Sequence, residues 1–144
     1  AIMYQESRFS AIAKPPRTKL LWIIPWKRPS TAYGYTQALD QTWQHYKKDA
    51  GKYMVSRDDF SDAADFVGWY GYRANKIAGI SRQDAYNLYL AYHEGVGGFK
   101  RRSYLAKPWL ISVAKKVKQK ARSYQFQLNR CQKSLETKPW WRIW

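Results

Sequence analysis

Hydrophobic side chains recur every three or four residues along most of the chain, which is the spacing of one buried helix face. Strict alternation of apolar and polar residues, which would indicate a half-buried strand, is nearly absent. The spacing predicts helices over residues 1–9, 36–50, 58–78, 81–94 and 108–130. We therefore expect a mainly α-helical fold.

Residues at the ends of these segments support the prediction. Ser56 with Asp59, and Ser81 with Asp84, form S-x-x-D pairs typical of a helix start. Glycines at 51, 79, 95, 97 and 98 are expected to end three helices, and Pro108 suits a first turn. The expected buried stripes are Phe60, Ala63, Ala64, Val67, Tyr70, Ala74 and Ile77; Ala85, Leu88, Tyr89 and Tyr92; and Leu110, Val113, Val117, Ala121, Tyr124 and Leu128.

Residues 14–34 interrupt the helical pattern. They hold four of the six prolines and end at Gly34, so they predict a long loop with a short strand, or a small β-hairpin, near residues 20–24. Loops of this length inside a compact domain are usually functional or disordered. The bulky apolar content, which includes Trp22 and Trp26, favours a functional loop.

The length of 144 residues suits one domain, and an aromatic content of 17% argues against disorder. We assign residues 1–130 to the domain and residues 131–144 to a basic, aromatic tail. The longest apolar run, residues 20–26, is too short to cross a bilayer. Because the chain starts at Ala1 rather than Met, we expect a processed chain whose upstream targeting segment is missing.

Charge and metal-ligand content narrow the function further. Twenty-six Lys and Arg against ten Asp and Glu give a net charge of +16, which indicates an anionic partner such as nucleic acid, anionic lipid or wall polymer. Cys131 is alone, and His45 and His93 lie far apart in the sequence. We therefore expect no disulfide framework within this chain, no metal and no cofactor.

Glu6 stands out among the acidic residues. It lies near the C-terminal end of an apolar helix, where the helix dipole disfavours a carboxylate and apolar neighbours raise the pKa of a carboxyl group. A carboxyl group that stays protonated near neutral pH can act as a general acid. The alternative is an ordinary surface Glu at a helix end.

Three motifs in sequence order favour the general-acid interpretation of Glu6 over an ordinary surface Glu. The chain reads Glu6-Ser7-x-Phe9-x-x-x-Ala13, then Gly34-Tyr35-Thr36-Gln37, then Ala91-Tyr92-His93-Glu94-Gly95-Val96-Gly97. This series resembles the soluble lytic transglycosylase family, whose motifs are E-S-x-F-x-x-x-A, G-L-M-Q and A-Y-N-A-G-x-G. The resemblance implies a lysozyme-like fold and cleavage of peptidoglycan.

The resemblance also implies roles for individual residues. Glu6 matches the catalytic acid and base, Gln37 a residue of the glycan groove, and Tyr92 a tyrosine whose hydroxyl lies near the catalytic carboxyl. Ser30 is a candidate for a loop serine near the acetamido group. Tyr35 and His93 stand where the family has Leu and Asn, and we count both as substrate-binding candidates. Further aromatic candidates for the groove are Trp22, Trp26, Tyr33 and Tyr89; core packing is the favoured interpretation for Tyr89.

By resemblance, Glu6 alone would cleave the bond between N-acetylmuramic acid and N-acetylglucosamine and leave a 1,6-anhydromuramoyl end. The alternatives are a lysozyme-type hydrolase, a basic nucleic-acid-binding module built on residues 115–122 and the tail, and a noncatalytic scaffold. Nucleic acid is the less favoured partner, since no nucleic-acid motif is present. Glu94 offers a second carboxylate, for which a structural ion pair with Lys or Arg is the favoured interpretation.

Family-like chains have more helix before the catalytic Glu than the five residues present here. Either an upstream stretch is missing from this chain, or the N-terminal packing differs from that of the family. If a stretch is missing, we expect it to carry a Cys that pairs with Cys131, because an unpaired thiol is unusual in an oxidising compartment. We expect a periplasmic protein, with a lipid anchor to the outer membrane supplied by that stretch.

Tyr35 and Thr36 should make the groove wall more polar than in the family.

Overall fold

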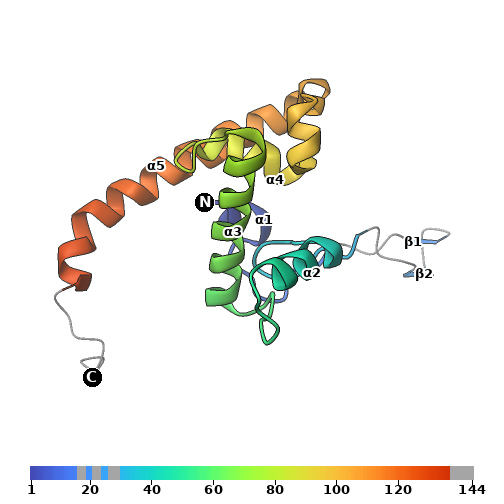
Figure 1. Ribbon diagram of the computed structural model, residues 1–144, viewed down its shortest axis with the longest axis horizontal. Helices are drawn as coiled ribbons and strands as arrows, with labels where there is room; N and C mark the ends of the chain where they lie inside the picture. The colour runs from blue at the N-terminus through green and yellow to red at the C-terminus, as the bar shows by residue number, and fades with distance from the viewer. Residues whose placement is uncertain (16–18, 21–23, 26–29, 137–144) are drawn as a thin grey trace.

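The computed structural model describes residues 1–15, 19–20, 24–25 and 30–136, and the fold is mainly α-helical, as predicted (Figure 1). None of the helices in these ranges combines the length and apolar character that a bilayer crossing needs. The elements in chain order are α1 (Ile2–Ser7), β1 (Lys19–Leu20), β2 (Ile24–Pro25), α2 (Asp40–Asp49), α3 (Phe60–Ala78), α4 (Ala85–Lys100), the 3-10 helix η1 (Ser103–Ala106) and α5 (Pro108–Glu136).

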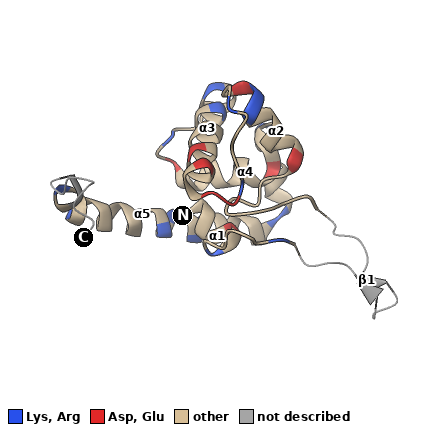
Figure 2. Cartoon of the chain, turned by 90° about the horizontal axis from the view of Figure 1, so that it is seen from below, with Lys and Arg blue, Asp and Glu red and all other residues tan. Residues whose placement is uncertain are grey.

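The predicted hairpin is present within the long loop. β1 and β2 pair antiparallel, with Leu20 opposite Ile24. The hairpin lies away from the helices (Figures 1 and 2). Trp22 and Trp26 lie outside the described residues, so their predicted place at the groove stays a prediction.

An aromatic cluster joins α2 to α3. Phe66 is fully buried at its centre, with ring centroids 5.1 Å from Trp43, 5.4 Å from Tyr46 and 5.7 Å from Trp69. Tyr92 of α4 adds an edge contact to Phe66 at 6.3 Å. The cluster therefore fixes α2, α3 and α4 relative to one another.

A second apolar cluster joins α4 to α5. Tyr89 and Leu90 of α4 pack with Leu110, Ala114 and Val117 from the first half of α5. The second half of α5 leaves the other helices, and residues 125–134 are exposed (Figure 1). Lys and Arg recur along this helix (Figure 2), and no Asp or Glu precedes Glu136 on it. α5 therefore carries a large share of the positive charge.

The start of α2 differs from the prediction. The helix begins at Asp40 rather than Thr36. Tyr33 forms a bridge with Ala38, and Gln37 has a φ of 52°, so the chain turns before it becomes helical. This turn carries the Gly-x-x-Gln motif.

The ends of α4 and α5 also differ from the prediction. The predicted stop after Glu94 corresponds to a kink at Gly95, whose φ of 72° and ψ of 154° are not helical. A further helical segment, included in α4, follows it to Lys100. α5 continues past Arg130 to Glu136, so the expected helix end at residue 130 is wrong. Cys131 lies exposed on α5, and the remainder of the expected tail, residues 137–144, falls outside the described residues.

Both S-x-x-D pairs mark helix starts, but the Asp rather than the Ser is the N-cap. The Asp59 carboxylate accepts the Asp62 N–H at 2.9 Å, and the Asp84 carboxylate accepts the Asn87 N–H at 3.1 Å. Gly79 ends α3 in the left-handed conformation, as predicted.

The buried faces follow the predicted stripes in part. Ala63, Tyr70 and Ala74 of α3 are buried, but Phe60 and Ile77 are exposed, and the buried Phe66 was not in the predicted stripe. On α5 the buried face ends after Val117, since the helix then leaves the domain. Leu128 is consequently exposed.

We predict that Phe66→Ala lowers the free energy of unfolding by about 3–5 kcal/mol, the usual cost of removing a fully buried aromatic side chain. Chemical denaturation measures the change. Phe126→Ala is the matched control, because Phe126 is 62% exposed on α5. Equal losses for the two variants would contradict the central position of Phe66.

Candidate active site

Glu6 lies one residue before the end of α1, which stops where Arg8 takes the left-handed conformation. Burial raises the pKa of the Glu6 carboxyl group above its ordinary value. A hydrogen bond with Tyr89 and the charge of nearby His93 oppose this rise without cancelling it. The pKa of Glu6 is thus shifted upward, which is the direction that its position in the sequence predicts.

Glu6 lines an open cavity of about 550 Å³. The cavity walls come from α1, the turn before α2, and the helices α2, α3 and α4. Four other predicted site residues line it as well. These are Ser30, Gln37, Tyr92 and His93.

The turn over residues 34–38 forms one side of this cavity and is held by its backbone. Gly34 has a φ of 75°, and a Cβ there would lie 2.1 Å from the Arg57 carbonyl oxygen, so only glycine fits. The Tyr35 N–H donates to that same carbonyl at 3.1 Å. Ser7, the neighbour of Glu6, donates from its hydroxyl to the Tyr35 carbonyl at 2.8 Å. The turn is therefore tied directly to α1.

Gln37 and Tyr92 complete these ties. The Gln37 side-chain amide donates to the Ala13 and Gly34 carbonyls, each at 2.9 Å. The Tyr92 hydroxyl donates to the Thr36 carbonyl at 2.8 Å. Both predicted site residues thus line the cavity and brace its wall.

Tyr89 hydrogen-bonds Glu6 and also packs in the core, the role that the sequence favours for it. It is buried, and burial together with the Glu6 charge raises the pKa of its phenol. Glu6 also raises the pKa of Tyr92, whose burial is the larger cause, so both tyrosines lie within electrostatic reach of the carboxyl group. Their spacing of one helical turn was the available signal, since residues three apart share a helix face.

A second hollow, of about 890 Å³, lies between the start of the chain, the loop before α4, and α5. Asp84 is the carboxylate that lines it, and that side chain caps α4. Within the described part of the chain, no three His, Cys, Asp or Glu side chains group together in a way that could hold a metal ion. The Glu6 cavity is therefore the candidate active site.

Comparison with protein families agrees with this geometry. The family described as "Transglycosylase SLT domain" matches residues 1–131. The chain belongs to the transglycosylase SLT domain family. Comparison with curated proteins and with solved structures gave no match. Membership implies, at the level of the family, an enzyme that cleaves glycosidic bonds of peptidoglycan.

Two departures from the SLT motifs lie away from the cavity. Tyr35 packs edge-on against Phe60 with ring centroids 5.5 Å apart, and it does not line the cavity. Thr36 is fully buried, and its hydroxyl has no hydrogen-bond partner among the described residues. The expected polar groove wall is therefore not formed by these two side chains. A substrate contact by Tyr35 stays a prediction.

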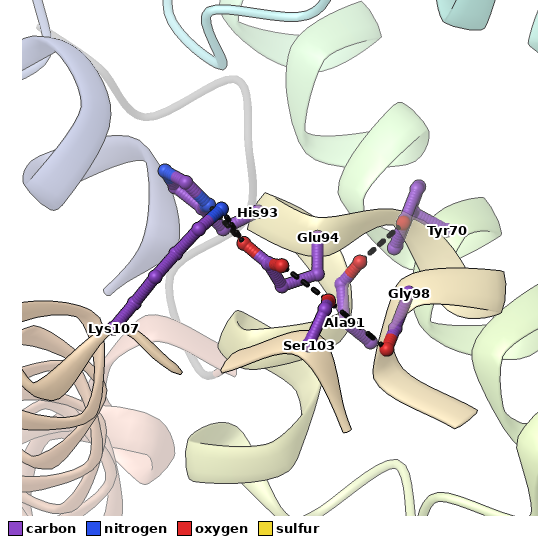
Figure 3. Close-up of polar contacts among 7 residues, drawn as sticks. All are labelled: Tyr70, Ala91, His93, Glu94, Gly98, Ser103 and Lys107. Carbon is purple, nitrogen blue, oxygen red and sulfur yellow. Dashed lines mark hydrogen bonds and ion pairs between the residues drawn. The ribbon is translucent and has the colours of Figure 1, made fainter. Parts of the chain in front are cut away.

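Glu94 shows the environment opposite to that of Glu6. Its side chain is 5% exposed and accepts from Lys107 at 2.7 Å, from His93 at 3.0 Å and from the Ser103 hydroxyl (Figure 3). The bonds to Lys107 and Ser103 lower the pKa of Glu94 to about 2. The favoured interpretation of Glu94 as a structural ion pair is confirmed.

We predict that Glu94 makes the fold sensitive to acid. Its pKa is about 2 in the folded chain and near its ordinary 4.5 in the unfolded chain, so its ionised form stabilises the fold fully above pH 4.5. This stabilisation is lost as the pH falls from 4.5 toward 2. Glu94→Gln should therefore flatten the fall of the unfolding free energy in this range, measured by denaturation at several pH values.

Glu6→Gln is the matched control for this measurement. The pKa of Glu6 is raised in the folded chain, so below pH 4.5 the group is protonated in both states and contributes little slope. An unchanged acid slope in Glu94→Gln would contradict the role assigned to this carboxylate.

Proposed function

We propose that this protein is a peptidoglycan lytic transglycosylase that uses Glu6 as its single acid and base. The observation that carries the proposal is the contrast between the two carboxyl groups of the cavity. Glu6 is half-buried with a raised pKa, whereas Glu94 is ionised and bonded to three protein partners. Glu94 is therefore not free to serve as a nucleophile or to activate water.

The single carboxyl group distinguishes two reaction classes. Retaining glycosidases place a second carboxylate about 5–5.5 Å from the acid, and inverting enzymes place one farther away to activate water. Among the described residues that line the cavity, Glu6 and Glu94 are the carboxylates. This supports intramolecular attack by the substrate over hydrolysis.

In the proposed reaction, protonated Glu6 donates its proton to the glycosidic oxygen between N-acetylmuramic acid and N-acetylglucosamine. The bond from that oxygen to C1 breaks, and the acetamido group of the substrate assists the positive charge at C1. Glu6, now ionised, takes the proton from the muramoyl 6-hydroxyl as its oxygen attacks C1. The products are a 1,6-anhydromuramoyl end and a free N-acetylglucosamine end, and Glu6 is protonated again.

The braced turn supports the positioning that this scheme needs. Tyr92 holds the Thr36 carbonyl, and Ser7 holds the Tyr35 carbonyl, so this wall of the cavity is fixed before substrate arrives. Preorganised geometry lowers the cost of orienting a bound substrate. We further propose that Ser30 and Gln37 face the glycan and that the enzyme acts in the periplasm.

We predict that Glu6→Gln lowers the release of anhydromuropeptides from purified sacculi by at least about 10²–10⁴-fold, the usual contribution of general acid–base catalysis. The variant should be at least as stable as the wild type at neutral pH, because glutamine removes the cost of ionising a buried carboxyl group. Mass spectrometry of the soluble products and thermal melts give both results.

Tyr92→Phe is the companion variant. It leaves the buried Thr36 carbonyl without its donor, which costs about 1–3 kcal/mol of stability, and it should reduce activity less than Glu6→Gln. Near wild-type release by folded Glu6→Gln would refute the assignment. Products with ordinary reducing ends would move the protein to the hydrolases.

The basic helix α5 supports attraction to an anionic wall or membrane surface. We predict that binding to sacculi weakens as salt is raised. At 0.1 M salt, dissolved ions largely screen the interaction between exposed charges that lie more than about 10 Å apart. Turnover of short neutral glycan fragments should change much less. Equal salt sensitivity in co-sedimentation and fragment assays would contradict a steering role for the charge.

A further inference from the structure

His93 is the member of the Glu6 cavity whose ring is fixed from two sides. Its Nδ1 lies 3.0 Å from a carboxylate oxygen of Glu94, and its ring meets Trp109 edge-on with centroids 5.1 Å apart. An ionised carboxylate can only accept, so Nδ1 carries the hydrogen. No other hydrogen bond reaches this ring from the described residues. Nε2 is thus left available to a ligand.

The Glu94 carboxylate that fixes His93 is itself held by two further side chains. Lys107 and Ser103 hold the Glu94 carboxylate from the segment between α4 and α5 (Figure 3). Ser103 also donates to the Gly98 carbonyl at 3.1 Å. A Cβ on Gly98 would lie 3.0 Å from the Ser103 hydroxyl and 3.1 Å from the Glu94 Cβ, so the cluster uses the small size of glycine.

The Glu94 side chain is buried, whereas the Lys107 side chain is 41% exposed, and their pairing stabilises the fold while Glu94 is ionised. A hydrophobic pair could close the same space. The effect that a hydrophobic pair could not reproduce is the orientation of the His93 ring. This points to a use for His93 at the cavity.

Trp109 is the aromatic residue that packs against His93. It lies in the first turn of α5, directly after Lys107 and Pro108, and it is 55% exposed beside the His93 ring. An exposed indole offers a large, rigid apolar face with a polar N–H, which suits the C–H face and hydroxyl rim of a sugar.

We propose that His93 and Trp109 form a sugar-binding subsite at the rim of the Glu6 cavity. Trp109 stacks against a pyranose ring, and Nε2 of His93 hydrogen-bonds one of its hydroxyl or acetamido groups. Glu94 is a positioning residue that acts through His93. The proposal rests on the glycan substrate of the proposed function, and it names two residues that set affinity for that glycan.

The test uses binding, so that it does not depend on turnover. In a Glu6→Gln background, titration calorimetry measures the dissociation constant for glycan strands from amidase-treated sacculi and for a hexamer of N-acetylglucosamine. Trp109→Ala and His93→Asn should each weaken binding about two- to tenfold, the range for one aromatic or neutral polar contact. Trp109→Phe should fall between Ala and wild type, which keeps the test valid if Ala disturbs folding.

Matched controls come from outside the cavity. His45→Asn removes a histidine that pairs with Arg73, and Phe126→Ala removes an exposed ring on α5. Both should bind like the parent. In the catalytically active chain, the subsite variants should raise KM with little change in kcat.

Glu94→Gln tests the positioning role separately. It should change the ¹⁵N imidazole signals of His93, because the amide cannot hold the hydrogen on Nδ1 as the carboxylate does, and glycan affinity should fall with it. Unchanged signals would remove Glu94 from the proposal.

The possible results separate the two claims. If the wild type releases anhydromuropeptides and the subsite variants bind glycan like the parent, the subsite is wrong and the proposed function stands. If the wild type releases nothing yet the variants weaken glycan binding, the subsite stands without the proposed chemistry. If the wild type releases nothing and the parent binds neither glycan, both fail.

Discussion

The turn over residues 34–38 is the constraint on which the site depends. Ser7 of α1 holds the Tyr35 carbonyl, and Tyr92 of α4 holds the Thr36 carbonyl. The Tyr35 N–H is held by the backbone carbonyl of Arg57, before α3. Segments that lie 28 and 56 residues apart in sequence are thereby brought to one cavity. Ser7, the neighbour of Glu6, takes part in these ties, so the turn also holds the end of α1 that carries Glu6.

The Gly34-x-x-Gln37 motif therefore supports the fold of the turn as well as lining the cavity. Gly34 provides a backbone conformation and a close approach that a Cβ would prevent. Gln37 uses its amide hydrogens on two carbonyls of the loop, so its side-chain oxygen is the part left for a ligand. Such residues hold the wall of the cavity and face it at the same time.

The cavity also separates two carboxyl groups by environment. Partial burial raises the pKa of Glu6, and its hydrogen bond with Tyr89 and the charge of His93 only partly oppose this rise. Glu94, on the same cavity, meets a lysine, a histidine and a serine, which favours the carboxylate. Environments that push two pKa values apart assign different roles to the same functional group. In this protein, one carboxyl group is suited to proton transfer and the other to orienting a neighbouring ring.

The sequence predicted the features that depend on local pattern. Helix type, the hairpin, the position of Glu6 near the end of α1 and the ionic role of Glu94 all follow from spacing and neighbours. Features set by tertiary contact were missed. Phe66 is buried because α2 and α4 cover it, and a further helical segment follows the kink at Gly95, where Phe99 packs against the cluster shared with α5.

The same limit applies to the site. Tyr89 and Tyr92 share a helix face, but only the folded chain shows that Tyr89 bonds the Glu6 carboxyl group while Tyr92 bonds a carbonyl. The late start of α2 could not be seen either, because Gln37 adopts a positive φ that side-chain contacts enforce. Trp109 carried no signal in the sequence beyond being an apolar residue after a proline.

The central claim is that burial keeps the Glu6 carboxyl group protonated where an ordinary glutamate would be ionised. The most direct measurement is an NMR titration of the ¹³C carboxyl signal of Glu6, assigned by its absence from the Glu6→Gln spectrum. The account predicts a midpoint above the ordinary value of 4.5. A midpoint at or below 4.5 would contradict it.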